Sequence, residues 1–299
     1  MAEKRKKFEV PGQKEAGIRI NKYLSDAGIC SRREADTYIA EGKVSIDGKT
    51  AETGSRVFPG QNVTFLGKTI QKQEEQVLIA FYKPAGIVCT TDTREPDNVI
   101  DYLNYGSRIY PIGRLDKDSE GLLLLTNDGD IVNKILRAGN HHEKEYQVTV
   151  NKPLTPEFLR GMASGVPILD TVTKPCKLEQ TGKNSFNIIL TQGLNRQIRR
   201  MCEYFDYRVT ALKRVRVMHI TLGRLNPGTY RNLTPAELDK LREVLKNSSA
   251  LPAAQQRKLE RSKKEQEKQN KDRIGAGYGR NEKQTAEKGK NRRTGRTVK

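Results

Sequence analysis

Five acidic residues lie within one short stretch of an otherwise strongly basic chain. The stretch "GRLDKDSEGLLLLTNDGD", residues 113–130, contains Asp116, Asp118, Glu120, Asp128 and Asp130. Carboxylates at this spacing could bind a calcium ion, form a solvated turn, or present one reactive acid to a substrate. The residues around these carboxylates help to decide among the three interpretations.

The calcium interpretation is the weakest of the three. Asp116, Asp118 and Glu120 mimic the first positions of an EF-hand loop, but Asn127 stands at the last position, where a bidentate glutamate is needed. The leucine run at 122–125 predicts a buried strand, not a metal-binding loop. We therefore expect no metal site in this stretch.

A solvated turn explains residues 117–120 better than it explains Asp116. Asp116 follows the apolar Leu115, has Arg114 nearby, and lies on a loop between two predicted strands. A neighbouring cation keeps a carboxylate ionised, and reactive groups are often placed on loops held by a rigid scaffold. The pattern alone leaves both interpretations open, with Asp116 as the candidate reactive acid.

The charge of the whole chain favours a polyanionic partner. The 299 residues carry 55 Lys and Arg against 36 Asp and Glu, a net charge of +19, and could form one large domain or two smaller ones. Residues 251–299 hold 16 of the basic and 6 of the acidic residues and show no sustained apolar period. Such a segment is typical of a disordered tail that binds nucleic acid through phosphate contacts or only increases solubility.

Cysteine and histidine usage argues against metal and disulfide frameworks. Four cysteines lie far apart without a CxxC pair, and three histidines have no metal-ligand spacing. This usage fits a reducing cytoplasm. The sequence also lacks an apolar run long enough to span a bilayer and a signal peptide. We expect a cytoplasmic protein without a metal or a membrane partner.

Residues 18–50 predict two helices followed by a hairpin. The first helix ends at Gly28, the second begins with a capping box of Ser31 and Glu34, and "KVSIDGKTA" gives a strand and an Asp-Gly turn. A helix N-terminus with cations beside it suits a phosphate. The candidate RNA contacts in this segment are Arg19, Lys22, Ser31, Arg32, Arg33 and Lys43.

The same segment resembles a known RNA-binding module. "RINKYLSDAGICSRREADTYIAEGKVSIDGK" is similar to the S4 domain, a small helical and hairpin fold (αL). We therefore expect residues 18–67 to form an S4-like domain. A disordered basic N-terminus would precede it at 1–17, and a polar linker would follow at 68–76.

Residues 77–248 predict a second, larger domain. Strands are expected at 77–81, 108–113, 121–127, 145–150, 185–192 and 219–225, and helices at 130–138, 156–164, 195–205 and 235–246. Strands outnumber helices and often follow one another directly. This order favours an α+β fold on a largely antiparallel mixed sheet over a doubly wound parallel sheet. Residues 249–299 would be the disordered basic tail.

Several motifs of the larger domain together resemble one enzyme family. "GRLDKDSEGLLLLTNDGD" is similar to the central motif of pseudouridine synthases. "YKPAGIVCTT" (82–91), "EKEYQVTV" (143–150), "GLNRQIRRMC" (193–202) and "ALKRVRVMHITLGRLNPGTYRNLT" (211–234) fit the same pattern in order. The resemblance is to the RsuA/RluB/RluE/RluF family, whose members carry an N-terminal S4 domain and act on ribosomal RNA. It covers residues 18–246.

The resemblance implies roles for three residues in catalysis. Asp116 would attack the nucleotide or act as a base, and Arg199 would form an ion pair with it. Tyr146 would stack on the uracil and take part in proton transfer. From the residues alone, Tyr146 could equally be a core aromatic of a strand, and Arg199 could lie on a basic helix face that touches phosphate.

Further residues would contact the RNA substrate. Leu212 would pack near the base, and Arg114 would fill the space that a flipped base leaves. Lys83 would contact phosphate or hold the turn after its strand, with the two roles equally favoured. The remaining expected contacts are Arg196, Arg200, Arg214 and Arg216, of which the last two alternate along a strand-like run and are expected to face one side.

The implied reaction is the isomerisation of uridine to pseudouridine in 23S ribosomal RNA, in the peptidyl-transferase region, on a flipped base. It needs no cofactor. The protein would act as a monomer on ribosomal RNA or on a large-subunit assembly intermediate. Another ribosomal RNA or a tRNA remains an alternative target. A non-catalytic RNA-binding or assembly protein with the same fold is the second alternative, and only Asp116, Tyr146 and Arg199 together distinguish it from an enzyme.

Overall fold

The computed structural model describes residues 17–70, 76–92, 94–136 and 142–246. The expected disordered ends, apart from Gly17, lie outside the described residues, as do residues 71–75 of the linker and the last residues of the helix predicted at 130–138. The linker prediction is wrong for residues 68–70, because they form a strand and a core contact of the N-terminal domain. None of the helices in the described ranges is long and apolar enough to cross a membrane. Within these ranges, no group of three His, Cys, Asp or Glu side chains is placed to hold a metal ion.

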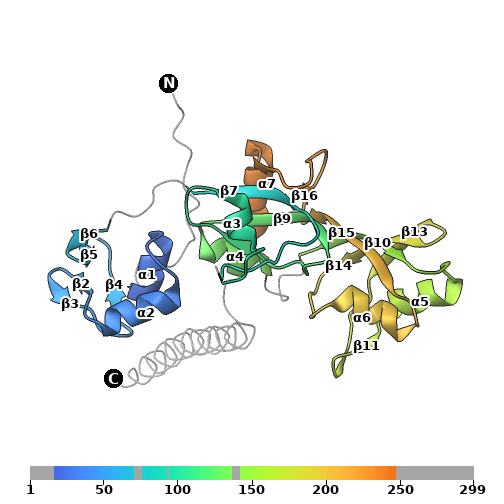
Figure 1. Cartoon of the computed structure of the whole chain (residues 1–299), viewed down its shortest axis with the longest axis horizontal. Helices are drawn as coiled ribbons and strands as arrows, with labels where there is room; N and C mark the ends of the chain where they lie inside the picture. The colour runs from blue at the N-terminus through green and yellow to red at the C-terminus, as the bar shows by residue number, and fades with distance from the viewer. Residues whose placement is uncertain (1–16, 71–75, 93, 137–141, 247–299) are drawn as a thin grey trace, which may run out of the picture. The chain divides into compact units, whose positions relative to one another are not determined.

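The N-terminal domain combines two short helices with short strands (Figure 1). Helices α1 (Ile20–Asp26) and α2 (Arg32–Ala40) pack on each other through Leu24, Ala35 and Ile39. The hairpin strands form a sheet in the order β3-β2-β5-β6, and β1 pairs with β4. The strands are β1 (Ile18–Arg19), β2 (Val44–Ile46), β3 (Lys49–Thr50), β4 (Arg56–Val57), β5 (Val63–Phe65) and β6 (Lys68–Thr69).

Two local predictions for this domain are confirmed. The hydroxyl of Ser31 accepts a hydrogen bond from the Glu34 N–H at 3.2 Å, and the Glu34 carboxylate accepts one from the Ser31 N–H at 2.6 Å. Asp47 and Gly48 both have positive φ, as a tight hairpin turn requires. The capping box therefore starts α2 where the sequence indicated, and the Asp-Gly pair forms the hairpin.

In the described residues, the larger domain is built on a nine-stranded sheet. Its main path runs β13-β14-β10-β15-β9-β7-β17, with β16 paired to β15 and β8 paired to β9. Every pairing is antiparallel except that of β15 with β9. The strands are β7 (Leu78–Lys83), β8 (Tyr110–Ile112), β9 (Glu120–Thr126), β10 (Lys144–Val150), β13 (Lys177–Gly182), β14 (Ser185–Leu190), β15 (Val209–Val217), β16 (Ile220–Thr221) and β17 (Tyr230–Asn232).

Helices cover the two faces of this sheet. They are α3 (Val99–Leu103), α4 (Gly129–Leu136), α5 (Pro156–Ser164), α6 (Gln197–Tyr204) and α7 (Pro235–Lys246). Strands β11 (Pro167–Ile168) and β12 (Thr171–Val172) form a separate hairpin. Figure 1 shows α5 and α6 near the end of the sheet that carries β10, β13 and β14, and α4 and α7 near β9. The expected α+β fold on a largely antiparallel mixed sheet is confirmed.

The leucine run of β9 is buried on both faces. Leu122 and Leu124 pack with α4 and α7, whereas Leu123 and Leu125 pack against α3 on the opposite side. A third cluster joins β10 and β14 to α5 and α6. Because successive strand residues point to opposite faces, an unbroken apolar run indicates a strand that is covered twice. The loop that connects β8 to β9 therefore leads into one of the most deeply buried strands.

Candidate active site

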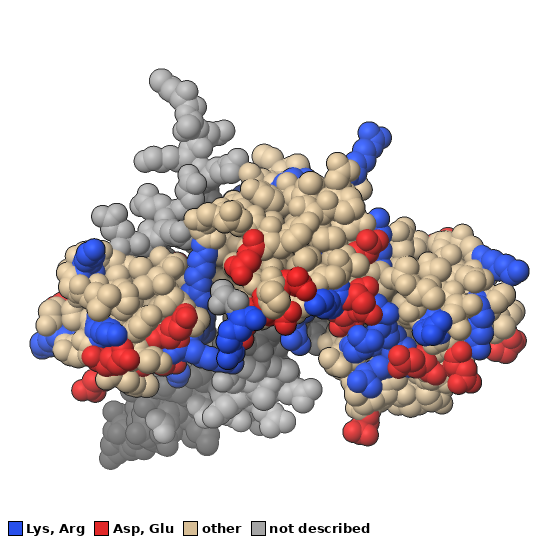
Figure 2. All heavy atoms as spheres, in the orientation of Figure 1, with Lys and Arg blue, Asp and Glu red and all other residues tan. Residues whose placement is uncertain are grey.

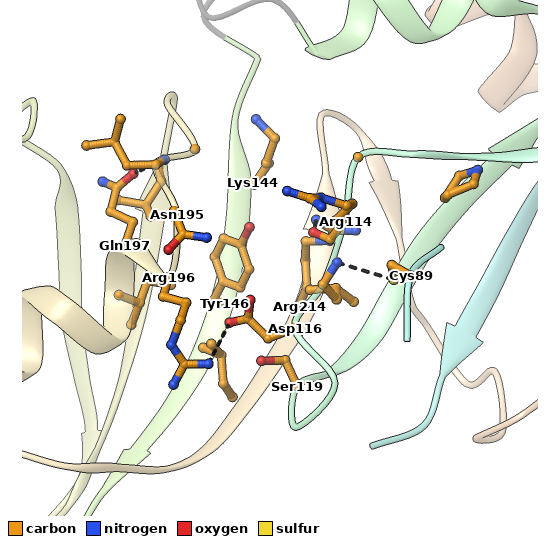
Figure 3. Close-up of a pocket in the computed structure, with 18 of the residues that line it drawn as sticks. Cys89, Arg114, Asp116, Ser119, Lys144, Tyr146, Asn195, Arg196, Gln197 and Arg214 are labelled. Carbon is orange, nitrogen blue, oxygen red and sulfur yellow. Dashed lines mark hydrogen bonds and ion pairs between the residues drawn. The ribbon is translucent and has the colours of Figure 1, made fainter. Parts of the chain in front are cut away.

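The loop that carries Asp116 joins β8 to β9 and is held by several backbone contacts (Figure 3). Leu115 is buried, and its N–H donates to the sulfur of Cys89 at 3.3 Å. The carbonyl oxygen of Lys117 accepts a hydrogen bond from the Gly86 N–H at 2.7 Å. The side chain of Asp116 itself stays 31% exposed. A fixed backbone thus presents one accessible carboxylate.

Arg214 holds both ends of this loop from β15. It is almost fully buried, and its guanidinium donates to the carbonyl oxygens of Leu122, at 2.7 Å, and Arg114, at 3.5 Å. Its Nη2 is buried and has no hydrogen-bond partner in the part of the chain that the structure describes. Gly121 allows the close approach of β9 and β15, because a Cβ there would collide with the backbone of Arg214. Gly121 is therefore needed for the parallel pairing of β9 with β15 next to the site.

The prediction that Arg214 and Arg216 face one side is wrong. On β10, Tyr146 pairs with Arg214 and Glu145 pairs with Arg216, so Val215 has no partner there. This bulge inserts one residue into β15, and residues two apart then lie on opposite faces. Arg214 faces the site, whereas the guanidinium of Arg216 forms ion pairs with Glu143 and Glu145 on the other face.

Arg199 approaches Asp116 but makes its shortest ion pair with another carboxylate. Its Nε lies 3.8 Å from Asp116 Oδ2, beyond hydrogen-bond distance, while its Nη2 lies 2.9 Å from Asp118 Oδ2. Nη2 also donates to the hydroxyl of Ser119 at 3.2 Å, and Nη1 to the carbonyl oxygen of Val209 at 3.4 Å. The side chain is 8% exposed. The structure therefore brings the expected pair together and adds Asp118 as a second acid.

Tyr146 and Leu212 lie in the same pocket as Asp116. The pocket has a volume of about 920 Å³ and is lined by residues of the Asp116 loop, β10, β15 and the segment before α6. Tyr146 packs against the two hydrophobic clusters that meet here, and Leu212 is buried on the neighbouring strand. In Figure 3 the ring of Tyr146 lies between the Asp116 loop and Asn195. A flat base could lie against this ring without displacing core side chains.

The other expected arginines occupy different positions. Arg114 is exposed at the rim and lines the pocket, as does Arg196, whose Nη1 lies 3.9 Å from both Asp116 and Asp118. Arg200 contacts the backbone and side chain of Asn195 and does not line the pocket. Figure 2 shows Lys and Arg side chains gathered with acidic ones over the region of α6.

Lys83 holds the turn and cannot reach a substrate. Its side chain is fully buried, and its ammonium donates to the carbonyl oxygens of Pro84 and Ile87, both at 2.8 Å, and of Lys117, at 3.3 Å. Burial lowers the pKa of this ammonium. The predicted phosphate contact is therefore wrong, because the Lys83 side chain is not exposed to solvent. The alternative prediction, that Lys83 holds the turn after its strand, agrees with these hydrogen bonds.

Lys83→Met is expected to lower both the free energy of unfolding and the activity. The substitution leaves the carbonyl oxygens of Pro84 and Ile87 without the ammonium donor, at a cost of about 1–3 kcal/mol for each unsatisfied group. It also releases the turn that ties residues 84–87 to the Asp116 loop. Denaturant unfolding and turnover should be measured against the exposed Lys177→Met as a control. Wild-type stability in Lys83→Met would contradict this role.

The candidate RNA contacts of the N-terminal domain differ in their exposure and in whether they form ion pairs. Arg32 and Arg33 are exposed on the first turn of α2, beside the capping Ser31, and Arg19 is exposed just before α1. Lys22 pairs with Asp26 at 2.6 Å along α1, and Lys43 with Glu41 at 2.6 Å. Within the described ranges, the α2 N-terminus therefore offers two basic side chains with no such ion pair.

Four residues of the site were not singled out from the sequence. Asp118 and Ser119 contact Arg199, Cys89 accepts from the Asp116 loop, and Lys144 lines the pocket. Of these four residues, only Lys144 could have been identified from the sequence. It precedes Tyr146 by two positions on a predicted strand, so the two side chains share a face.

Two family models and a solved structure match this chain. The family model described as "RNA pseudouridylate synthase" matches residues 77–204, and the model described as "S4 domain" matches residues 18–63. A solved structure described as a pseudouridylate synthase has a TM-score of 0.56 and 29% identity, and covers 75% of this chain and 99% of its own.

Curated relatives match over most of the chain. The dual-specificity RNA pseudouridine synthase RluF of Escherichia coli K12 is 55% identical over 238 residues, 79% of this chain and 82% of its own. The ribosomal large subunit pseudouridine synthase B of Bacillus subtilis is 36% identical over 235 residues, 76% of this chain and 96% of its own. The stretch "DKDSEGLLLLTNDGDIVNKILRAGNHHEKEY" resembles the F type, in agreement with the first of these relatives.

Proposed function

Since this chain belongs to the RNA pseudouridine synthase family and is an RNA pseudouridine synthase, we propose that its substrate is 23S ribosomal RNA. The family membership decides against a non-catalytic RNA-binding protein. The ribosomal target is supported by the name of the B-type relative and by the resemblance to synthases that act on ribosomal RNA. Within 23S RNA, that resemblance favours a uridine of the peptidyl-transferase region, in free RNA or in an assembly intermediate.

The observation that carries the proposed mechanism is the meeting of Asp116 and Tyr146 in one pocket, with Arg199 3.8 Å from Asp116. A uridine inside a stacked helix cannot reach these groups, so the target base is flipped into the pocket. There it stacks on Tyr146 with Leu212 beside it. Stacking of a base on an aromatic ring contributes about 1–3 kcal/mol.

Asp116 then acts on the ribose of the flipped nucleotide. Its carboxylate either attacks C1′ or removes a proton from the sugar, and both routes break the N1–C1′ bond. Arg196 and Arg199 lie 3.9 Å and 3.8 Å from Asp116 Oδ2, and their positive charges attract the carboxylate and help to position it. The freed uracil rotates and its C5 bonds to C1′, which breaks the bond to Asp116 in the first route or is followed by return of the sugar proton in the second. Tyr146 stacks on the ring during this rotation and takes part in proton transfer, and Arg114 at the rim fills the place that the base left.

A tRNA is the second candidate substrate. The term "dual-specificity" in the name of the relative with 55% identity favours a second RNA target, and a tRNA is the alternative that the sequence left open. The S4 domain suits either RNA, because a helix N-terminus with Arg32 and Arg33 beside it binds phosphate without reading bases.

Mapping of pseudouridines tests the proposed target. Ribosomal RNA and tRNA from cells with and without the gene are compared by chemical mapping at single-nucleotide resolution. The proposal expects a pseudouridine of 23S RNA to disappear with the gene and to return with a plasmid copy. An unchanged 23S RNA together with a lost tRNA site would replace the ribosomal target by tRNA.

Deletion of residues 251–299 is expected to weaken RNA binding mainly at low salt. The segment carries 16 basic and 6 acidic residues, and cations that replace counterions on phosphates give affinity that falls steeply with salt. The dissociation constant should be measured over a salt series for both proteins. The logarithmic salt slope should flatten by about 0.7–0.9 for every phosphate that the shortened protein no longer neutralises. A loss of equal size at every salt concentration would contradict purely electrostatic binding.

A further inference from the structure

Lys144 lines the pocket on the same strand face as Tyr146. It opens β10 two residues before Tyr146, and their regular pairing with Leu190 and Ile188 of β14 keeps both side chains on one side. In Figure 3, Lys144 lies beyond the phenol end of Tyr146, and Asp116 lies near the other end of the ring. A base stacked on this ring with its sugar at Asp116 would point its far edge toward Lys144.

The ammonium of Lys144 has no ion pair within the described residues. The acids on either side of it in sequence, Glu143 and Glu145, both pair with Arg216. Its Nζ donates to the carbonyl oxygen of His142 at 3.4 Å, a long contact. Burial, and then the charge of Arg214, lower the pKa of Lys144 to about 8.

A second cation lies beside it. Arg214 stands directly opposite Tyr146 on β15, and its buried Nη2 lacks a hydrogen-bond partner among the described residues. The charged and titratable side chains that line this pocket with Lys144 are Cys89, Arg114, Asp116, Lys117, Tyr146, Arg196 and Arg214. Because Asp116 is the one carboxylate among these lining residues of the described chain, the pocket holds an excess of positive charge.

The reaction creates an anion that fits this charge. When the N1–C1′ bond breaks, its electron pair stays on the uracil, and the negative charge spreads over N1, O2 and O4. When C5 bonds to C1′, the ring returns the electron pair, C5 releases a proton and N1 takes one up. Cations already in place where charge develops lower the barrier, because they interact more strongly with the anion than with the neutral base.

We infer that Lys144 is a catalytic residue, whose ammonium, supported by Arg214, contacts the oxygen edge of the flipped uracil and stabilises its anion. Asp116 works at the sugar end of the nucleotide and Lys144 at the base end. The inference rests on the proposed stacking at Tyr146. It assigns to Lys144 a contact with the base and not with a backbone phosphate.

The test compares Lys144→Met with Lys144→Arg. Both are assayed on a 23S RNA fragment under single-turnover conditions with saturating enzyme, and RNA affinity is measured separately over a salt series. Wild-type turnover is established first, because its absence would refute the proposed ribosomal target and not the role of Lys144. The exposed Lys177→Met, on β13, is the matched control, and thermal unfolding shows that each variant is folded.

We expect Lys144→Met to slow the single-turnover rate by about tenfold to a hundredfold, somewhat less than the loss of an oxyanion-hole donor. Its RNA affinity and salt slope should match those of the wild type, and Lys144→Arg should recover most of the rate. Weaker affinity and a flatter salt slope with an unchanged rate would overturn the inference in favour of a phosphate contact. A slow rate that Arg does not restore would overturn it in favour of a structural role.

The pH dependence of kcat/KM distinguishes a catalytic role of Lys144 from a structural one, because only a catalytic ammonium makes the rate follow its own titration. The ammonium is charged below its pKa of about 8 and neutral above it, so kcat/KM of the wild type should fall as the pH rises through that value. Lys144→Arg stays charged and should lose this fall. The same fall in both proteins would contradict the role of Lys144.

Discussion

Asp116→Ala is expected to abolish pseudouridine formation while leaving RNA affinity nearly unchanged. The carboxylate is the only acid among the described residues that line the pocket, and its loop is fixed by contacts of its backbone and of Leu115, not by its side chain. Truncation should therefore remove the reactive group without moving the site. A fall in rate of about 10⁴–10⁶-fold is the scale seen when one member of a catalytic unit is removed.

Two further variants sharpen this test. Asp116→Asn keeps the size of the side chain and removes only its charge and basicity, so it should be as inactive as Asp116→Ala. Asp239→Asn makes the same change on α7 at an acid that is 73% exposed, and should behave as wild type. Product formation by purified Asp116→Ala on a ribosomal RNA fragment would show that another residue acts as the nucleophile or base.

Arg199→Met is expected to reduce the turnover by about 10²–10³-fold, the scale seen when one electrostatic donor is removed from a closed site. The substitution removes the cation that lies between Asp116 and Asp118 and leaves both acids to repel each other. It also removes the hydrogen bond from α6 to Ser119 at the end of the Asp116 loop and the one to Val209 on β15.

Arg199→Lys should restore only part of this loss. An ammonium carries the charge, but it cannot reach two carboxylates, a hydroxyl and a carbonyl oxygen at once, as the planar guanidinium does. The exposed Arg208→Met serves as the control for the loss of one positive charge. Single-turnover rates and RNA affinities should be measured together. A wild-type rate in Arg199→Met would mean that the neighbouring Arg196 is sufficient for Asp116.

Much of the fold could be predicted from local pattern. The capping box of α2, the Asp-Gly hairpin and the helices Pro156–Ser164 and Pro235–Lys246 each follow from residues close together in the chain. The predicted strand at 121–127 corresponds to β9, which begins one residue earlier. These elements are specified by short-range capping, turn geometry and apolar periodicity, which a single sequence contains.

What could not be predicted depends on register and on contacts between distant segments. The opposite faces of Arg214 and Arg216 follow from a bulge that only the pairing with β10 reveals. The pairing of Arg199 with Asp118 and the burial of Lys83 join residues that are far apart in the chain. The short α3 carries too few residues to show a helical period. Family resemblance indicates the site residues, whereas their neighbours are set by the folded chain.

The extra residue Val215 also limits how this chain can change in length. If Val215 were removed, Arg214 and Arg216 would become neighbours on β15 and would still point to opposite faces, so both guanidinium groups would keep their places. If Lys213 were removed instead, Arg214 would stand opposite Gln147 and would point away from the reactive loop. Changes in length should therefore be tolerated at Val215 and at outer hairpins such as residues 182–185, but not in the evenly paired part of this strand.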